Sequence, residues 1–123
     1  MATNALNWFE IPATDLGRAT AFYETAMATK LEPVDMGDMK MAFFPADEDG
    51  VGGGLIQHPQ AVPSTQGSRI YLNANPDLQN ILDRVPAAGG QVVMPKTQIT
   101  PEIGYMAMFM DTEGNVVALH SNG

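Results

Sequence analysis

Two titratable side chains interrupt otherwise apolar stretches of the chain. Glu10 lies in NWFEIPA, residues 7–13, and His120 lies in NVVALHS, residues 115–121. A carboxylate in a half-enclosed cavity loses solvation, so its pKa rises unless a partner accompanies it. A desolvated carboxylate and an imidazole can both titrate near neutrality. Glu10 and His120 are therefore candidate catalytic residues, acting as an acid–base pair.

Each of the two residues also has a simpler interpretation. Glu10 can form an ion pair with Arg69 that merely fixes two parts of the fold together. His120 stands close to the C-terminal residue of the sequence and can be a solvated strand end. The sequence leaves both alternatives open.

Strand alternation adds further candidates around these two. Residues two apart on a strand share a face, so Trp8 accompanies Glu10, while Arg69 and Asn73 accompany Tyr71. Trp and Tyr present flat apolar surfaces with one polar tip, as the walls of small-molecule pockets commonly do. The predicted ligand-binding set is Trp8, Glu10, Arg69, Tyr71, Asn73 and His120.

Composition narrows the classes of partner. Fourteen acidic residues against six basic ones give a net charge of -8, which disfavours binding to nucleic acid or to an anionic membrane surface. The absence of cysteine excludes disulfides and cysteine metal sites. No apolar run is long enough to span a bilayer and no leader pattern is visible, so we expect a cytoplasmic protein. Nine methionines suit either an adaptable core or an adaptable pocket.

Both halves of the chain follow the order strand, helix, strand, strand, strand. The first half has a helix at 16–27 and strands at 7–13, 31–36, 39–46 and 52–57, whereas the second has strands at 69–74, 91–98, 103–111 and 115–121. The turns DEDG and DTEG align the halves at an offset of 64, and the first strands align at 61. We expect a single domain, residues 1–123, with module one at about 1–58 and module two at about 67–123.

Local signals set the expected limits of the two helices. Thr14 or Asp15 can cap the first helix. Asn75-Pro76 has the composition of a cap followed by a first helical residue, and Gly89-Gly90 ends the second helix. Pro86 removes a backbone hydrogen bond, so we expect the second helix to end or kink near Arg84 or Val85.

These elements predict an α+β fold. Two paired βαβββ modules would form a curved mixed sheet around a concave cavity, because neither module can bury a sheet face alone. The helices would cover the convex face, and the ligand-binding residues above would face the cavity.

The segment FEIPATDLGRATAFYE and the ending DTEGNVVALHS, together with the paired modules, resemble the vicinal oxygen chelate superfamily. This superfamily includes glyoxalases, bleomycin-resistance proteins and extradiol dioxygenases. The resemblance implies a divalent metal on the concave face, with ligands at Trp8, Gly54, Arg69 or Ser68, and Ala118. Indole, glycine, guanidinium and methyl groups supply no metal donor, so we expect neither the usual metal site nor another cofactor.

The resemblance then implies a metal-free protein that binds a small molecule, as the bleomycin-resistance branch does, and pairs as a homodimer. The alternative is a lyase or isomerase resembling lactoylglutathione lyase. Such an enzyme would use an atypical metal site built from Glu10, His120 and Gln57, or the Glu10–His120 pair without metal.

Overall fold

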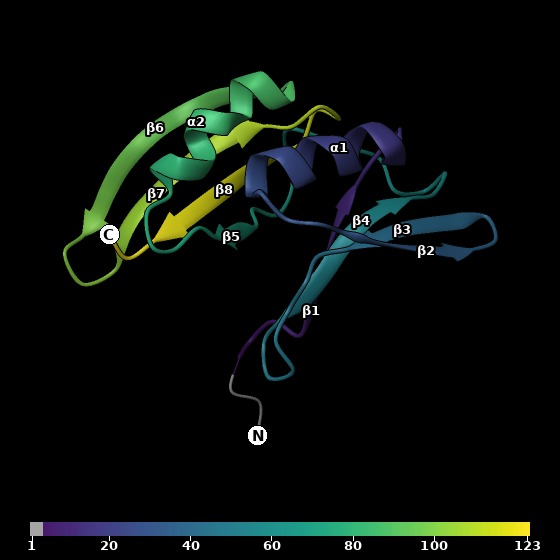
Figure 1. Ribbon diagram of the computed structural model, residues 1–123, viewed down its shortest axis with the longest axis horizontal. Coiled ribbons are helices and arrows are strands. Elements are labelled where there is room, and N and C mark those ends of the chain that lie inside the picture. The colour runs from purple at the N-terminus through teal and green to yellow at the C-terminus, as the bar shows by residue number, and fades with distance from the viewer. Residues whose placement is uncertain (1–3) are drawn as a thin grey trace.

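The computed structural model describes residues 4–123 and contains two helices and eight strands in two four-stranded mixed sheets (Figure 1). Module one contains β1 Trp8–Pro12, α1 Leu16–Met27, β2 Glu32–Met36, β3 Met39–Phe43 and β4 Gly52–Gln57. Module two contains β5 Tyr71–Asn73, α2 Gln79–Ala88, β6 Gln91–Thr100, β7 Gly104–Met110 and β8 Val116–Ser121. The predicted α+β class is confirmed. Within residues 4–123, neither helix has the length and apolarity needed to cross a membrane.

The strand register shows the internal repeat directly. The sheets have the orders β1-β4-β3-β2 and β5-β8-β7-β6, each with one parallel pair that involves the first strand of its module. Glu10 pairs with Gly54 in module one, and Tyr71 pairs with Ala118 in module two. Tyr71 follows Glu10 by 61 positions and Ala118 follows Gly54 by 64, so both predicted offsets are confirmed.

The two helices lie side by side between the sheets, which diverge on either side of them (Figure 1). The N-terminal residue of α1 is capped as expected, because Asp15 Oδ1 accepts a hydrogen bond of 3.1 Å from the Arg18 amide. On the inner face of α1, Phe22 and Tyr23 are fully buried against Phe109 of β7. The shared core therefore joins both modules on their helix-covered sides.

The prediction for the first residue of α2 was wrong. Asn75 and Pro76 lie before the helix, and α2 begins at Gln79. The Leu78 amide donates to Ser121 Oγ at 3.0 Å, and the Gln79 amide donates to Asp77 Oδ1 at 2.9 Å. A serine 43 positions away thus supplies a helix-terminal acceptor that local sequence signals cannot reveal.

Pro86 does not end α2 near Arg84 or Val85, so that half of the prediction was wrong. The helix continues to Ala88, so the proline stands in the last turn, where it lacks the amide that would donate to the Leu82 carbonyl. Gly89 then adopts a left-handed conformation with a φ of 104°. The amides of Gly89 and Gly90 donate to the carbonyls of Pro86 and Val85, which satisfies the end of the helix.

A turn of module two, residues 111–115, is buried against α1 and β1 of module one. The Tyr23 hydroxyl donates to Asp111 Oδ2 at 2.7 Å, and Asp111 Oδ1 accepts from the amides of Glu113 and Asn115. Asn115 Nδ2 donates to the Pro12 carbonyl at 2.7 Å. Gly114 closes the turn at a φ of 92°. We call the residues of this turn the intermodule clamp.

Glu113 connects the clamp to the N-terminus of α1. Its Oε1 accepts from the Thr14 and Asp15 amides at 2.9 and 2.8 Å, and its Oε2 pairs with Arg18 Nε at 2.7 Å. Burial of the carboxylate opposes ionisation, but the hydrogen bonds from Arg18, Asp15 and Thr112 outweigh it and hold the pKa of Glu113 at about 2.

We expect Glu113→Gln to lower the free energy of unfolding by about 1–2 kcal/mol near neutral pH, since the half-exposed Arg18 screens part of the interaction. The folded pKa lies below the ordinary value of 4.5, so the wild-type advantage is complete above 4.5 and disappears as the pH falls towards 2. Urea unfolding of both proteins across this pH range measures the difference.

Glu48→Gln is the matched control, because Glu48 is exposed in a turn of module one. If Glu113→Gln lowers the free energy of unfolding by the same amount down to the lowest pH, the stabilisation does not come from the ionised Glu113 carboxylate.

Candidate functional site

Each sheet has one face covered by helices and one face that they leave open, which we call the helix-free face. On β1, Ile11 is buried and Phe9 packs against the core, so Trp8, Glu10 and Pro12 share the other face. On β5 and β8 the buried residues include Leu72, Val117 and Leu119. The alternation predicted for β1 and β5 is confirmed, whereas on β8 Ala118 is buried as well as its two neighbours.

Trp8 lies on the helix-free face of module one and remains 42% exposed. Its ring meets Phe43 edge-on, with centroids 5.1 Å apart, and it lies over Gly52, where an added Cβ would come within 3.2 Å of the indole. Trp8 Nε1 donates to Glu10 Oε2 at 3.3 Å. The Phe43 ring and the Glu10 carboxylate therefore hold the exposed indole in place.

Tyr71, which corresponds to Glu10 at the offset of 61, lies on the helix-free face of module two and is 49% exposed. The register places Tyr71, Ala118 and Met108 in one row across the sheet. The Arg69 guanidinium reaches the same row and donates to Met108 Sδ. Asn73, two residues along β5, accepts from the Asn75 amide at 3.0 Å and so stabilises the turn that follows.

His120 has a partner of its own. Its Nε2 lies 2.6 Å from the carbonyl oxygen of Ile103, in the connection between β6 and β7. A carbonyl oxygen can only accept, so this contact requires the hydrogen on Nε2 and leaves Nδ1 as the free ring nitrogen. Val116 and His120 both belong to β8, where they alternate with the buried Val117 and Leu119.

The structure does not join the predicted site residues to one another across the two modules. Among residues 4–123, no hydrogen bond or salt bridge links Glu10 to Arg69, Tyr71 or His120; the salt bridges are Arg18–Glu113 and Lys96–Asp77. The anticipated Glu10–Arg69 ion pair is not formed within the chain. The acid–base role of Glu10 and His120 stays a prediction.

A hollow of about 240 Å³ lies along the boundary between the modules. It is lined by Glu10, Ile11, Pro12, Val62, Ser64, Gln66, Ser68, Ile70, Asn115, Val116 and Val117. Glu10 is the one predicted site residue among them. The volume is below the roughly 300 Å³ of small-molecule pockets, so this hollow alone is an incomplete site. A depression of about 460 Å³ beside the second half of α1 contains none of the predicted residues.

The linker residues Ser64, Gln66 and Ser68 were missed as pocket-lining groups by sequence reasoning. Their only signal is a run of small and polar residues, PSTQGS, between the two modules. The Ser64 amide donates to Asn115 Oδ1 at 3.1 Å, which holds this linker beside the clamp. Contacts of this kind join positions 51 apart and leave no periodic pattern.

Most methionines lie on the helix-free faces. The strand register and alternation place seven of the nine there: Met36, Met39, Met41, Met94, Met106, Met108 and Met110. Of these, Met41 is buried, whereas Met36 is 58% exposed. The flexible methionine side chains therefore lie mainly on the helix-free faces and contribute little to the core beneath the helices.

Comparisons with known proteins agree with this architecture. The profile of the Glyoxalase/Bleomycin resistance protein/Dioxygenase superfamily matches residues 5–119. A glyoxylase-like domain-containing protein of Didymella fabae is 30% identical over 118 residues, which cover 93% of this chain and 91% of that protein.

Solved structures of similar fold include a glyoxalase-related enzyme from Fulvimarina pelagi, with a TM-score of 0.68 and 16% identity over 98% of this chain and 88% of that one. A glyoxalase I mutant from Zea mays gives a TM-score of 0.72 and 22% identity, over 94% of this chain but 46% of that one. At these identities the likeness concerns the fold.

The residues at the expected metal-ligand positions do not fit a divalent ion. Trp8 and Ala118 offer no suitable donor, and Arg69 is cationic. A Cβ at Gly54 would lie 2.7 Å from the Ala42 carbonyl oxygen, so this position has no room for a ligating side chain. Within the described part of the chain, no three His, Asp or Glu residues cluster as a metal site would require.

We therefore expect the purified protein to hold less than about one tenth of an equivalent of zinc, nickel, manganese or iron(II) after equilibration with each ion. Elemental analysis before and after equilibration measures this. One tight equivalent per chain would contradict the expectation, and its loss in His120→Ala would identify the imidazole as a ligand.

Proposed function

The chain belongs to the glyoxalase/bleomycin resistance protein/dioxygenase superfamily, and we propose that it binds a small organic molecule on its helix-free sheet faces without a resident metal. The observation that carries this proposal is the pair of exposed aromatic side chains, Trp8 and Tyr71, one on each helix-free face. Large exposed apolar groups next to a few polar ones are typical of binding surfaces.

The surroundings of both aromatic rings support a ligand role. Glu10 stands beside Trp8, and Arg69 reaches the row that contains Tyr71, so each ring has one charged neighbour that can orient a ligand. Methionines line the rest of these faces and can adapt to the shape of an apolar body. Binding by sequestration, as in the bleomycin-resistance branch, would need no catalytic group.

Trp8 is the single tryptophan and provides the readout for a ligand screen. We expect compounds with an aromatic or branched apolar body to change its fluorescence saturably in the presence of a chelator. Tyr71→Ser should weaken such binding by about tenfold, because it removes one aromatic contact surface.

Val93→Thr is the matched control, because Val93 is equally exposed but lies on the outer strand β6. Binding that disappears with the chelator, or that survives Tyr71→Ser at full strength, would contradict the proposal.

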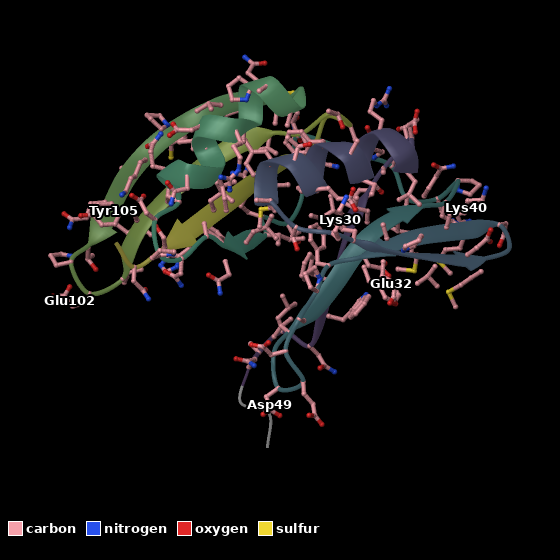
Figure 2. The ribbon with its side chains drawn as sticks, viewed as in Figure 1. Lys30, Glu32, Lys40, Asp49, Glu102 and Tyr105 are labelled. Atoms are coloured by element: carbon pink, nitrogen blue, oxygen red, sulfur yellow. The ribbon has the colours of Figure 1, made fainter. Side chains whose placement is uncertain are left out.

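We further propose that two copies of the chain pair, so that module one of each faces module two of the other and encloses the ligand. The hollow within one chain is smaller than typical small-molecule pockets, and the intermodule clamp holds the modules so that their helix-free faces stay uncovered. The faces are complementary in charge: the first carries Glu10 and Glu32, and the second carries Arg69. Glu32 lies on the strand at the outer edge of its sheet (Figure 2).

Sedimentation equilibrium should give about twice the 13.2 kDa mass of one chain. Trp8→Asp should shift the protein towards the monomer, because it replaces an apolar contact by a second carboxylate beside Glu10. Val93→Asp should leave the dimer intact. Dissociation by Val93→Asp and not by Trp8→Asp would place the interface elsewhere.

A further inference from the structure

Arg69 is a cation without an ion-pair partner among the described residues, as are the exposed Lys30 and Lys40, but it differs from both lysines in lying on a helix-free sheet face. Arg18 pairs with Glu113, Lys96 pairs with Asp77, and Arg84 donates to the Ala26 carbonyl. Arg69 makes no salt bridge within residues 4–123, and its guanidinium instead donates to the neutral sulfur of Met108. A guanidinium has five N–H donors, so this contact leaves most of its hydrogen-bonding capacity free.

The side chains around Arg69 are apolar. The row Tyr71–Ala118–Met108 crosses the sheet, and Arg69 spans it over the small Ala118, which is fully buried. Met106 and Met110 share this face of β7 with Met108. Among the described residues, Arg69 is the only Arg, Lys, Asp or Glu that the register and contacts place on this face.

An exposed cation on an apolar surface favours an anion that also carries an apolar body. A guanidinium is weakly hydrated and presents a planar fork that matches a carboxylate in a bidentate pair. The ring of Tyr71 and the flexible methionines would meet the remainder of such a ligand. The overall charge of -8 repels anions at long range, but salt screens that repulsion, whereas it affects a direct contact much less.

From this arrangement we propose that Arg69 binds the carboxylate of an aromatic or branched monocarboxylic acid, whose apolar part rests on Tyr71 and the methionines of β7. This inference rests on the proposed small-molecule binding and adds the chemical class of the ligand. No bond is made or broken.

The test uses phenylacetate, its neutral analogue phenylacetamide and the cation phenethylamine. Isotope-labelled methionine methyl groups report binding by NMR, with Met106, Met108 and Met110 as reporters on β7. We expect phenylacetate to shift these resonances saturably and to bind about tenfold more tightly than phenylacetamide in the wild-type protein. Phenethylamine should bind more weakly than either.

Arg69→Gln should bring phenylacetate and phenylacetamide to within about twofold of each other, while Arg69→Lys should keep part of the preference. Lys40→Gln is the matched control, because it also removes one positive charge. Lys40 lies in module one, at the opposite end of the molecule from Glu102 and Tyr105 of module two (Figure 2). The wild-type comparison does not depend on any variant folding correctly.

The outcomes separate this inference from the proposed function. Equal binding of phenylacetate and phenylacetamide to the β7 methionines would overturn the role of Arg69 and leave small-molecule binding standing. No shift of any methionine with any of the three probes would argue against both. If Arg69→Gln dissociates the dimer and the wild-type protein does not prefer phenylacetate, the guanidinium belongs to the subunit contact, with Glu10 of a second copy as its partner.

Discussion

The buried carboxylate of Asp111 is the group on which the arrangement of the two modules depends. A carboxylate with 5% exposure is tolerated only when its oxygens accept hydrogen bonds, and here the partners come from both modules. Burial, followed by the neighbouring Asp111 carboxylate, raises the pKa of Tyr23 well above its usual range, so the phenol remains a donor. The turn can satisfy Asp111 only while it stays docked on α1.

This docking decides which surfaces of the molecule are open. With α1, α2 and the clamp packed between the modules, the helix-covered faces form the common core and the helix-free faces point outwards. The open faces then expose Trp8 and Tyr71 together with most of the methionines. Because the helices pack between the modules, one apolar face of each sheet stays uncovered. A ligand and a second copy of the chain can cover these faces.

Sequence patterns predicted the elements more reliably than their ends. The apolar spacing of α1 and its Asp15 cap act within a few residues, and both are present in the structure. The first residues of α2 depend instead on Ser121, which is distant in the chain, and the helix runs past Pro86 to Ala88, where Gly89 ends it. Likewise, strand alternation identified which side of β1 holds Glu10, but nothing local indicated that its nearest polar partner is Trp8.

Residue types and their spacing were enough to predict the repeated βαβββ order, the offsets between the halves and the faces of β1 and β5. With the resemblance to the superfamily, they also indicated that the expected metal positions lack donors. The element order and the strand faces follow from residue type and short-range periodicity. The offsets follow from comparing the two halves, and the expected metal positions follow from the resemblance to the superfamily. Three features became visible in the folded chain alone: Glu10 and Arg69 take different partners, residues 111–115 hold the modules together, and methionines line the helix-free faces. Those outcomes depend on contacts between residues far apart in the chain, for which packing and hydrogen-bond satisfaction, rather than local propensity, select the partner.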